Sequence, residues 1–178
     1  MSIEDLILRA TAWASLLAWT ASEWLKSTAV AVSVRGTRAR AFSTAGVLAL
    51  CAHSALAFHT RYGWSHEAAR RETARQTEAV TGLAFGGGLY VNEVFLIVWF
   101  VEVLWWWRAA ARYRSRGRAL EWPVRAFFLL MFVSGAIVFA HGPVRLAGIA
   151  AVLAVAWAWY RGANGDRRSG AQREVAHG

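Results

Sequence analysis

The sequence is short of cysteine and of acidic residues. It has one cysteine, Cys51, among 178 residues, and 11 acidic against 20 basic residues, for a net charge of +9. One thiol excludes a disulfide framework or a thiolate metal cage within a single chain. The basic residues lie in gaps between apolar blocks, so we expect them to face a membrane surface and expect no nucleic acid as partner.

Recognisable catalytic arrangements are also missing. We find no Ser/His/Asp nucleophile set and no pair of acid/base carboxylates. Gly86, Gly87 and Gly88 do not form a phosphate-binding loop, because no strand precedes them and no lysine follows. The chain is therefore not expected to be an enzyme on its own. Its start also lacks a signal peptide, since Glu4 and Asp5 precede an apolar run, and we expect this segment to be retained.

Long apolar blocks dominate what is present, with 57% hydrophobic residues in all. A bilayer core about 30 Å thick needs about 20 apolar residues in a helix. The chain thus predicts an all-α integral membrane protein, a single transmembrane domain over 1–160 with about five spans. The expected spans are 6–25, 42–59, 82–107, 123–140 and 144–160, with Pro123 in the first turn of the fourth. The polar, Gly-rich tail 161–178 is expected to be disordered.

A short surface helix is predicted between the second and third spans, from about His66 to Val80. This connection has good helix formers and no proline. Ser65 is a suitable N-cap, and Glu67 falls in the first turn, where the helix dipole favours an anion.

The distribution of basic residues predicts the orientation. If the loops alternate, one side holds 13 basic residues and the other 5, namely Arg61, Arg70, Arg71, Arg75 and Arg145. The richer side is cytoplasmic by the positive-inside rule, so the N-terminus lies outside, and the surface helix with it, and the C-terminus inside. All basic residues but Lys26 are arginine, as in GC-rich bacterial genomes, which favours a bacterial inner membrane. Tryptophans at the inner boundary fit an aromatic belt: Trp24, Trp105, Trp106, Trp107, Trp122, Trp157 and Trp159.

The third block carries Asn92 and Glu93 near its middle. A carboxylate there costs about 2.5 kcal/mol or more to insert, so Glu93 should face protein. It shares a helical face with small and aromatic residues, and a similar stripe of small residues surrounds His53 on the second span. We expect these stripes to pack together: Gly82, Gly86, Tyr90, Glu93, Ile97 and Phe100 against Gly46, Ala49, His53 and Ala57. Glu102, on the opposite face, should meet an inner-loop arginine or headgroup water.

Histidines gather near the outer side in this topology. His53 lies roughly 9 Å below the outer end of its span, close to the depth of Glu93, and His59, His66 and His141 lie above. Such imidazoles could hold haem b or a transition metal, with Tyr90, Asn92 and Glu93 nearby. A proton or quinone site using His53 and Glu93, or a buried polar pair that only fixes helix packing, are the alternatives.

The functional hypothesis is an integral subunit or accessory of a larger membrane assembly, a redox complex being one case, whose contacts are the lipid bilayer and the other subunits. A proton-coupled transporter is the alternative, although the sequence shows no inverted repeats and five spans suit that class poorly. A structural scaffold without ligand is the third hypothesis.

Overall fold

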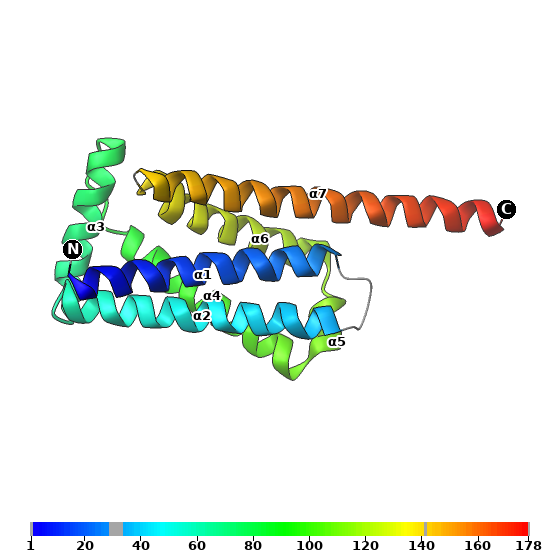
Figure 1. Ribbon diagram of the computed structural model, residues 1–178, viewed down its shortest axis with the longest axis horizontal. Coiled ribbons are helices and arrows are strands. Elements are labelled where there is room, and N and C mark those ends of the chain that lie inside the picture. The colour runs from blue at the N-terminus through cyan, green and yellow to red at the C-terminus, as the bar shows by residue number, and fades with distance from the viewer. Residues whose placement is uncertain (1, 29–33, 141, 178) are drawn as a thin grey trace.

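The computed structural model describes residues 2–28, 34–140 and 142–177, with side chains described for 2–27, 36–140, 142 and 144–162. All regular structure in this described part is helical (Figure 1). The elements in order are α1 (Ile3–Thr28), α2 (Val34–Thr60), α3 (His66–Thr81), α4 (Gly88–Arg108), α5 (Ala110–Arg114), α6 (Arg118–Val133), the π-helical turn η1 (Ser134–Val138) and α7 (Pro143–His177).

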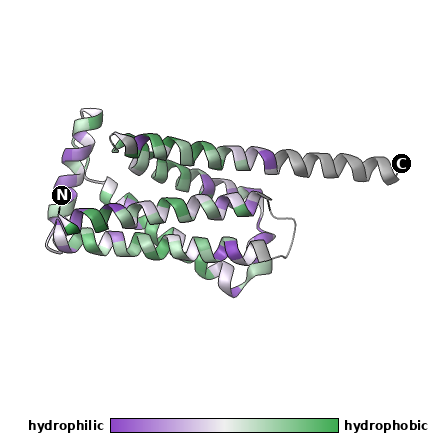
Figure 2. Cartoon of the chain, viewed as in Figure 1, coloured by the Kyte–Doolittle hydropathy of each residue, from purple (hydrophilic) through white to green (hydrophobic). Residues whose placement is uncertain are grey.

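Five long helices, α1, α2, α4, α6 and α7, form a bundle along the long axis of the molecule (Figure 1). Helix α3 lies across one end, beside the N-terminus, and α5 lies at the other. We call these the α3 end and the α5 end. Polar residues concentrate on α3 and near the α5 end, whereas the middle of the bundle is largely apolar (Figure 2).

In the part of the chain that the structure describes, four helical segments are long and apolar enough to cross a membrane: Gly36–Thr60, Gly88–Arg108, Arg118–Val138 and Val144–Gly162. Only 11 to 22% of each is buried within the chain, so most of their apolar surface faces outward, as lipid contact requires. The chain is therefore an all-α, multi-pass membrane bundle, as expected. Helix α1 is not one of these four candidates, yet it packs along α2 and α7, and its buried Ser22 hydroxyl donates to the Ala39 carbonyl at 2.9 Å.

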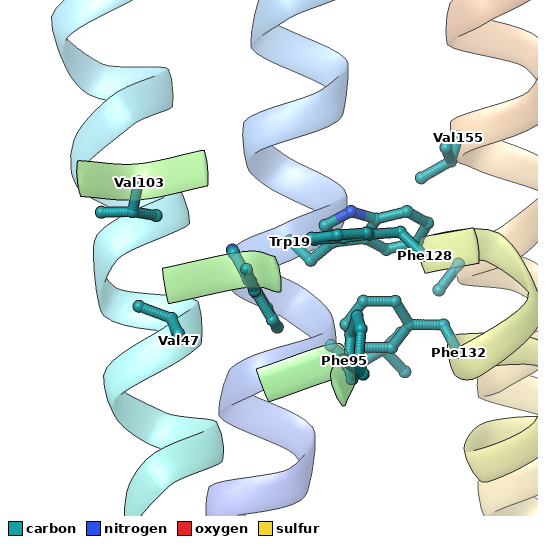
Figure 3. Close-up of a cluster of buried hydrophobic side chains, with 10 residues drawn as sticks. Trp19, Val47, Phe95, Val103, Phe128, Phe132 and Val155 are labelled. Atoms are coloured by element: carbon teal, nitrogen blue, oxygen red, sulfur yellow. The ribbon is translucent and has the colours of Figure 1, made fainter. Parts of the chain in front are cut away.

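Aromatic rings fill the centre of the bundle (Figure 3). Trp19 of α1 stacks on Phe132 of α6 with ring centroids 4.3 Å apart, while Phe95 meets Phe132 edge-to-face at 5.6 Å. Trp99 of α4 is 1% exposed and donates its indole N–H to the Ser43 hydroxyl at 3.1 Å. Edge-to-face and offset contacts of this kind add to the stabilisation from burial. These aromatic contacts pack the middle of the bundle, between the α3 end and the α5 end.

The predicted surface helix is confirmed, whereas the predicted start of the third span at residue 82 was wrong. Helix α3 begins at His66, and the Ser65 hydroxyl accepts from the Ala68 N–H at 3.2 Å. The expected span from 82 begins instead at Gly88, because Gly82 adopts a left-handed conformation (φ 78°) as the C-cap of α3. Glycine is a common left-handed terminator and a poor helix former, which explains why the run of glycines at 86–88 delays the helix.

Three further boundaries differ from expectation. Helix α2 begins at Val34 rather than 42, and α6 begins at Arg118, which places Pro123 inside the helix and not in its first turn. Helix α7 continues to His177, so the expected tail boundary at 160 falls within it. A proline inside a helix removes one backbone hydrogen bond. In α6 this loss occurs at Pro123, well before the π-helical turn that follows the helix.

That end, η1, has one residue more per turn than an α-helix. The Phe139 N–H donates to the Ser134 carbonyl five residues back, at 3.0 Å. Helix α7 approaches η1 closely at this point. A Cβ on Gly148 would lie 2.3 Å from the Ala136 carbonyl oxygen, so only glycine can occupy this position without a shift. The wide turn and Gly148 thus fit each other at the α3 end.

Candidate functional site

The predicted partnership of His53 with Glu93 is not present. His53 Nδ1 lies 3.0 Å from the Leu8 carbonyl oxygen and 3.4 Å from the Thr11 hydroxyl, so this imidazole joins α2 to α1. Because a carbonyl can only accept, the ring N–H donates to Leu8. The proposed packing of small stripes was also wrong, since Gly46 faces Trp99.

Glu93 meets a different histidine. Its Oε1 lies 3.3 Å from His66 Nδ1, at the start of α3, with the two side chains 37% and 65% exposed. The face of α4 expected to be buried is exposed at Tyr90, Ile97 and Phe100, and Asn92 is exposed too. The buried face of α4 consists of Leu89, Phe95, Trp99, Val103 and Trp106.

The remaining histidines do not extend this pair into a cluster. His59 is exposed, with its ring 6.4 Å from that of Trp64. His141 lies outside the described residues. Within the described ranges, no three His, Cys, Asp or Glu side chains gather closely enough to hold a metal ion. Among the predicted site residues that the structure describes, His66 and Glu93 are the two brought into contact.

The strongest convergence of polar groups lies at the α5 end, in what we call the charged chamber. It is defined by charged and phenolic side chains from α1, α4, α5, α6 and the 115–117 connection: Glu23, Lys26, Glu102, Tyr113, Arg116 and Arg125. These side chains enclose about 340 Å³ that no protein atom fills and that is partly open to solvent. Within it, the centre of a water molecule has about 20 Å³ in which to move. A cavity of that size holds one or two water molecules.

Glu23 is the most deeply buried ionisable group of the chamber, with 5% of its side chain exposed. Lys26 Nζ donates to its Oε1 at 2.6 Å, and the Trp159 indole N–H of α7 donates to its Oε2 at 2.9 Å. Arg125 of α6 approaches Oε2 at 3.9 Å and pairs with Glu121 at 2.8 Å. One carboxylate thus joins α1, α6 and α7.

Glu102 forms the second anionic centre. The Tyr113 hydroxyl donates to its Oε2 at 3.0 Å, and Arg116 donates to the same oxygen. The side chains of Glu102 and Arg116 are only 12% and 8% exposed. This ion pair folds the connection after α5 back onto α4, and it agrees with the expectation that Glu102 meets an inner-loop arginine.

Aromatic faces enclose these charges. Trp106 and Tyr113 stack with centroids 4.8 Å apart, and Lys26 Nζ lies 4.9 Å from the Trp106 centroid. Arg116 lies 4.3 Å over the Tyr113 ring. Burial raises the pKa of the Tyr113 phenol, so it stays a hydrogen-bond donor at neutral pH. Trp106 and Trp159, which were expected in the aromatic belt, therefore contact the polar groups of the chamber instead.

The chamber favours a ligand that accepts hydrogen bonds. Its lining has three cations and two carboxylates, and Glu121 outside balances Arg125. One ammonium and two guanidinium groups carry many more N–H donors than the carboxylates can satisfy. Because the charges balance, the preference is set by the surplus of donors, and water or a small anion can accept hydrogen bonds from them.

Sequence reasoning treated these residues separately. From the sequence alone, Glu23 lies near the end of the first expected span, and Arg116 lies in the basic stretch after the third. The signals that could have found the chamber are the i, i+3 pair Glu23 and Lys26 and the i, i+4 pair Glu121 and Arg125, at the ends of two spans expected on the same side of the membrane.

Neither a model of a known protein family, nor a curated protein, nor a solved structure matches this chain.

Proposed function

We propose that the chain handles protons at the charged chamber, as an integral subunit or accessory of a bacterial inner-membrane assembly. The observation that carries this proposal is the position of Glu23 and Glu102, two buried carboxylates that share a water-sized cavity with three cations in a membrane bundle. Ionisable groups buried among membrane helices are expensive and usually mark ion or proton pathways. The proton-coupled hypothesis is therefore preferred to the redox one.

The aromatic core bears on how such a protein would work. Trp19, Trp99 and Phe128 line the chamber and belong to the packed centre of the bundle (Figure 3). Protons reach the chamber from the α5 end, and passage to the α3 end requires these rings to move.

Proton flux into liposomes tests the proposal. Full-length protein is reconstituted, a pH gradient is imposed with the membrane potential clamped by potassium and valinomycin, and internal pH is followed with a dye. We expect flux above that of protein-free vesicles, loss of flux in Glu102→Gln, and full flux in the control Glu78→Gln, whose carboxylate is exposed on α3. Equal flux in wild type and Glu102→Gln, or none in wild type, would overturn the proposal.

The proposed topology has α1 as a fifth span, the N-terminus outside and the α5 end in the cytoplasm. It rests on the excess of basic residues on that side and on the packing of α1 along α2 and α7. Single cysteines test it in a Cys51→Ser background. A membrane-impermeant maleimide should label Glu78→Cys on α3 in intact cells and leave Ser115→Cys unlabelled; the reverse pattern would refute the orientation.

A second candidate is a haem b or transition-metal site at the α3 end, within a redox assembly. The contact of His66 with Glu93 is the observation that favours it, because imidazole and carboxylate are suitable ligands for such metals. A Soret band or stoichiometric metal that is lost in His66→Ala would support this candidate. Protein purified from its host membrane with neither would exclude it.

A further inference from the structure

Charge balance in the chamber has a consequence for what can enter it. Lys26, Arg116 and Arg125 face Glu23 and Glu102, with Glu121 paired to Arg125, so the set is neutral as a whole. Removing or adding a single charge in a buried ion-pair network is costly. An anion that enters must therefore bring a compensating positive charge, and the smallest is a proton.

The two carboxylates are not equally suited to take that proton. Glu23 accepts from Lys26 and Trp159 and has Arg125 at 3.9 Å. Glu102 has one cation in direct contact, Arg116, with the Tyr113 hydroxyl as its other donor. Protonation therefore disrupts fewer charged contacts at Glu102 than at Glu23.

The groups around Glu102 come from every neighbouring element. Across the chamber α1 presents Lys26 and Glu23 and α6 presents Arg125; α5 and its following connection present Tyr113 and Arg116. Helices α2 and α7 contribute the uncharged Ser43 and Trp159. Once Glu102 is neutral, Arg116 has no carboxylate partner in the chamber, and its freed N–H groups face the cavity with those of Lys26.

We propose that the charged chamber binds one small anion together with one proton, the proton residing on Glu102 and the anion on Arg116 and Lys26. Both arrive from solution, so the net charge of the chamber is unchanged. The space limits the anion to one no larger than chloride or formate. This inference rests on the proposed proton-handling function and names the ion that accompanies the proton.

Chloride is the probe, because it cannot itself be protonated at these pH values. Binding of radioactive chloride to the purified full-length protein in detergent is measured by equilibrium dialysis in chloride-free buffers from pH 5 to 9. We expect chloride affinity to fall as pH rises, by at most tenfold per pH unit, with up to one proton taken up per chloride bound in weakly buffered solution at the alkaline end of this range.

Variants assign the roles. Glu102→Gln should bind chloride with no pH dependence and no proton uptake, Arg116→Gln should lose binding, and the surface control Glu78→Gln should match wild type. Tyr113→Phe removes a donor to the charged form of Glu102, so its chloride binding should persist to higher pH than that of wild type. Circular dichroism and gel filtration verify that each variant is folded.

Two results would overturn the inference: no chloride binding by wild type at any pH, or chloride binding without proton uptake. Both results are measured on wild type, so either is decisive even if Glu102→Gln is unstable. Proton flux in liposomes that is independent of chloride would leave the proposed function standing while removing this inference, and coupled binding without flux would do the reverse.

Discussion

Removal of the Glu23 carboxylate should destabilise the bundle strongly. In Glu23→Gln the shape of the side chain is kept, but Lys26 loses the negative charge whose oxygen lies 2.6 Å from its ammonium group, and a neutral amide stands in its place. Arg125 retains Glu121 at 2.8 Å, so the uncompensated charge is that of Lys26. Loss of one partner from a buried pair costs about 3 to 5 kcal/mol. Because Lys26 is 20% exposed, the lower end applies, and we expect about 3 kcal/mol.

A double-mutant cycle separates this charge effect from loss of packing. Lys26→Met leaves Glu23 with Trp159 and the more distant Arg125, so it should cost less, about 2 kcal/mol. The double variant Glu23→Gln/Lys26→Met has no unpaired charge, and it should be no less stable than the worse single variant. The coupling energy is then about 2 kcal/mol.

The assay is reversible unfolding in mixed micelles of increasing dodecyl sulfate content, followed by tryptophan fluorescence. The exposed pair on α3 supplies the control: Glu67→Gln breaks its contact with Arg70 but should leave stability nearly unchanged, because solvent screens exposed ion pairs. Additive costs in the double variant, or a cost for Glu23→Gln as small as that for Glu67→Gln, would refute the reasoning.

Other predictions concern packing, capping and titration. Gly46→Ala should cost about 1 to 3 kcal/mol in the same assay, because its Cβ would lie 2.7 Å from the buried Trp99 ring, whereas Gly36→Ala, which meets nothing within 4 Å, should not destabilise. Ser65→Ala removes the N-cap of α3 and should cost about 1 kcal/mol locally, seen as faster amide exchange in the first turn of α3 with no change in the bundle. Since burial raises the pKa of Tyr113, its contribution to stability is complete below about pH 10 and falls as pH rises through the raised pKa. Tyr113→Phe should remove that alkaline loss, and an unchanged pH profile would argue against burial as its cause.

The membrane fold followed from the sequence because each span is encoded locally. A run of apolar residues is visible without knowing its neighbours, and the end of α3 is marked by Gly82. The errors lay where local signals conflict. The stretch 82–107 is apolar enough to span from its first residue, but its glycines cannot sustain a helix, so α4 starts at Gly88.

The site was less predictable because it depends on rotation of helices about their axes. Depth along a helix can be read from residue number, and His53 and Glu93 do lie in the half of the bundle near the α3 end. Which faces meet is decided by packing, and the aromatic residues Phe95 and Trp99 turn the other face of α4 inward. The chamber also needs Arg116 from a connection, and a loop residue carries no periodic pattern that shows where it folds back.

The π-helical turn η1 gives the end of α6 room for one residue that a regular α-helix would not hold there. A single wide turn holds one residue more than an α-helical turn, so the helical packing before and after it can be kept. Deletion of one residue from 134–138 should thus be tolerated by the Phe128 and Phe132 contacts yet move the Ala136 carbonyl away from Gly148. Because the connection between η1 and α7 is short, α7 would then pack against α6 at a different angle, and Trp159 would move with it.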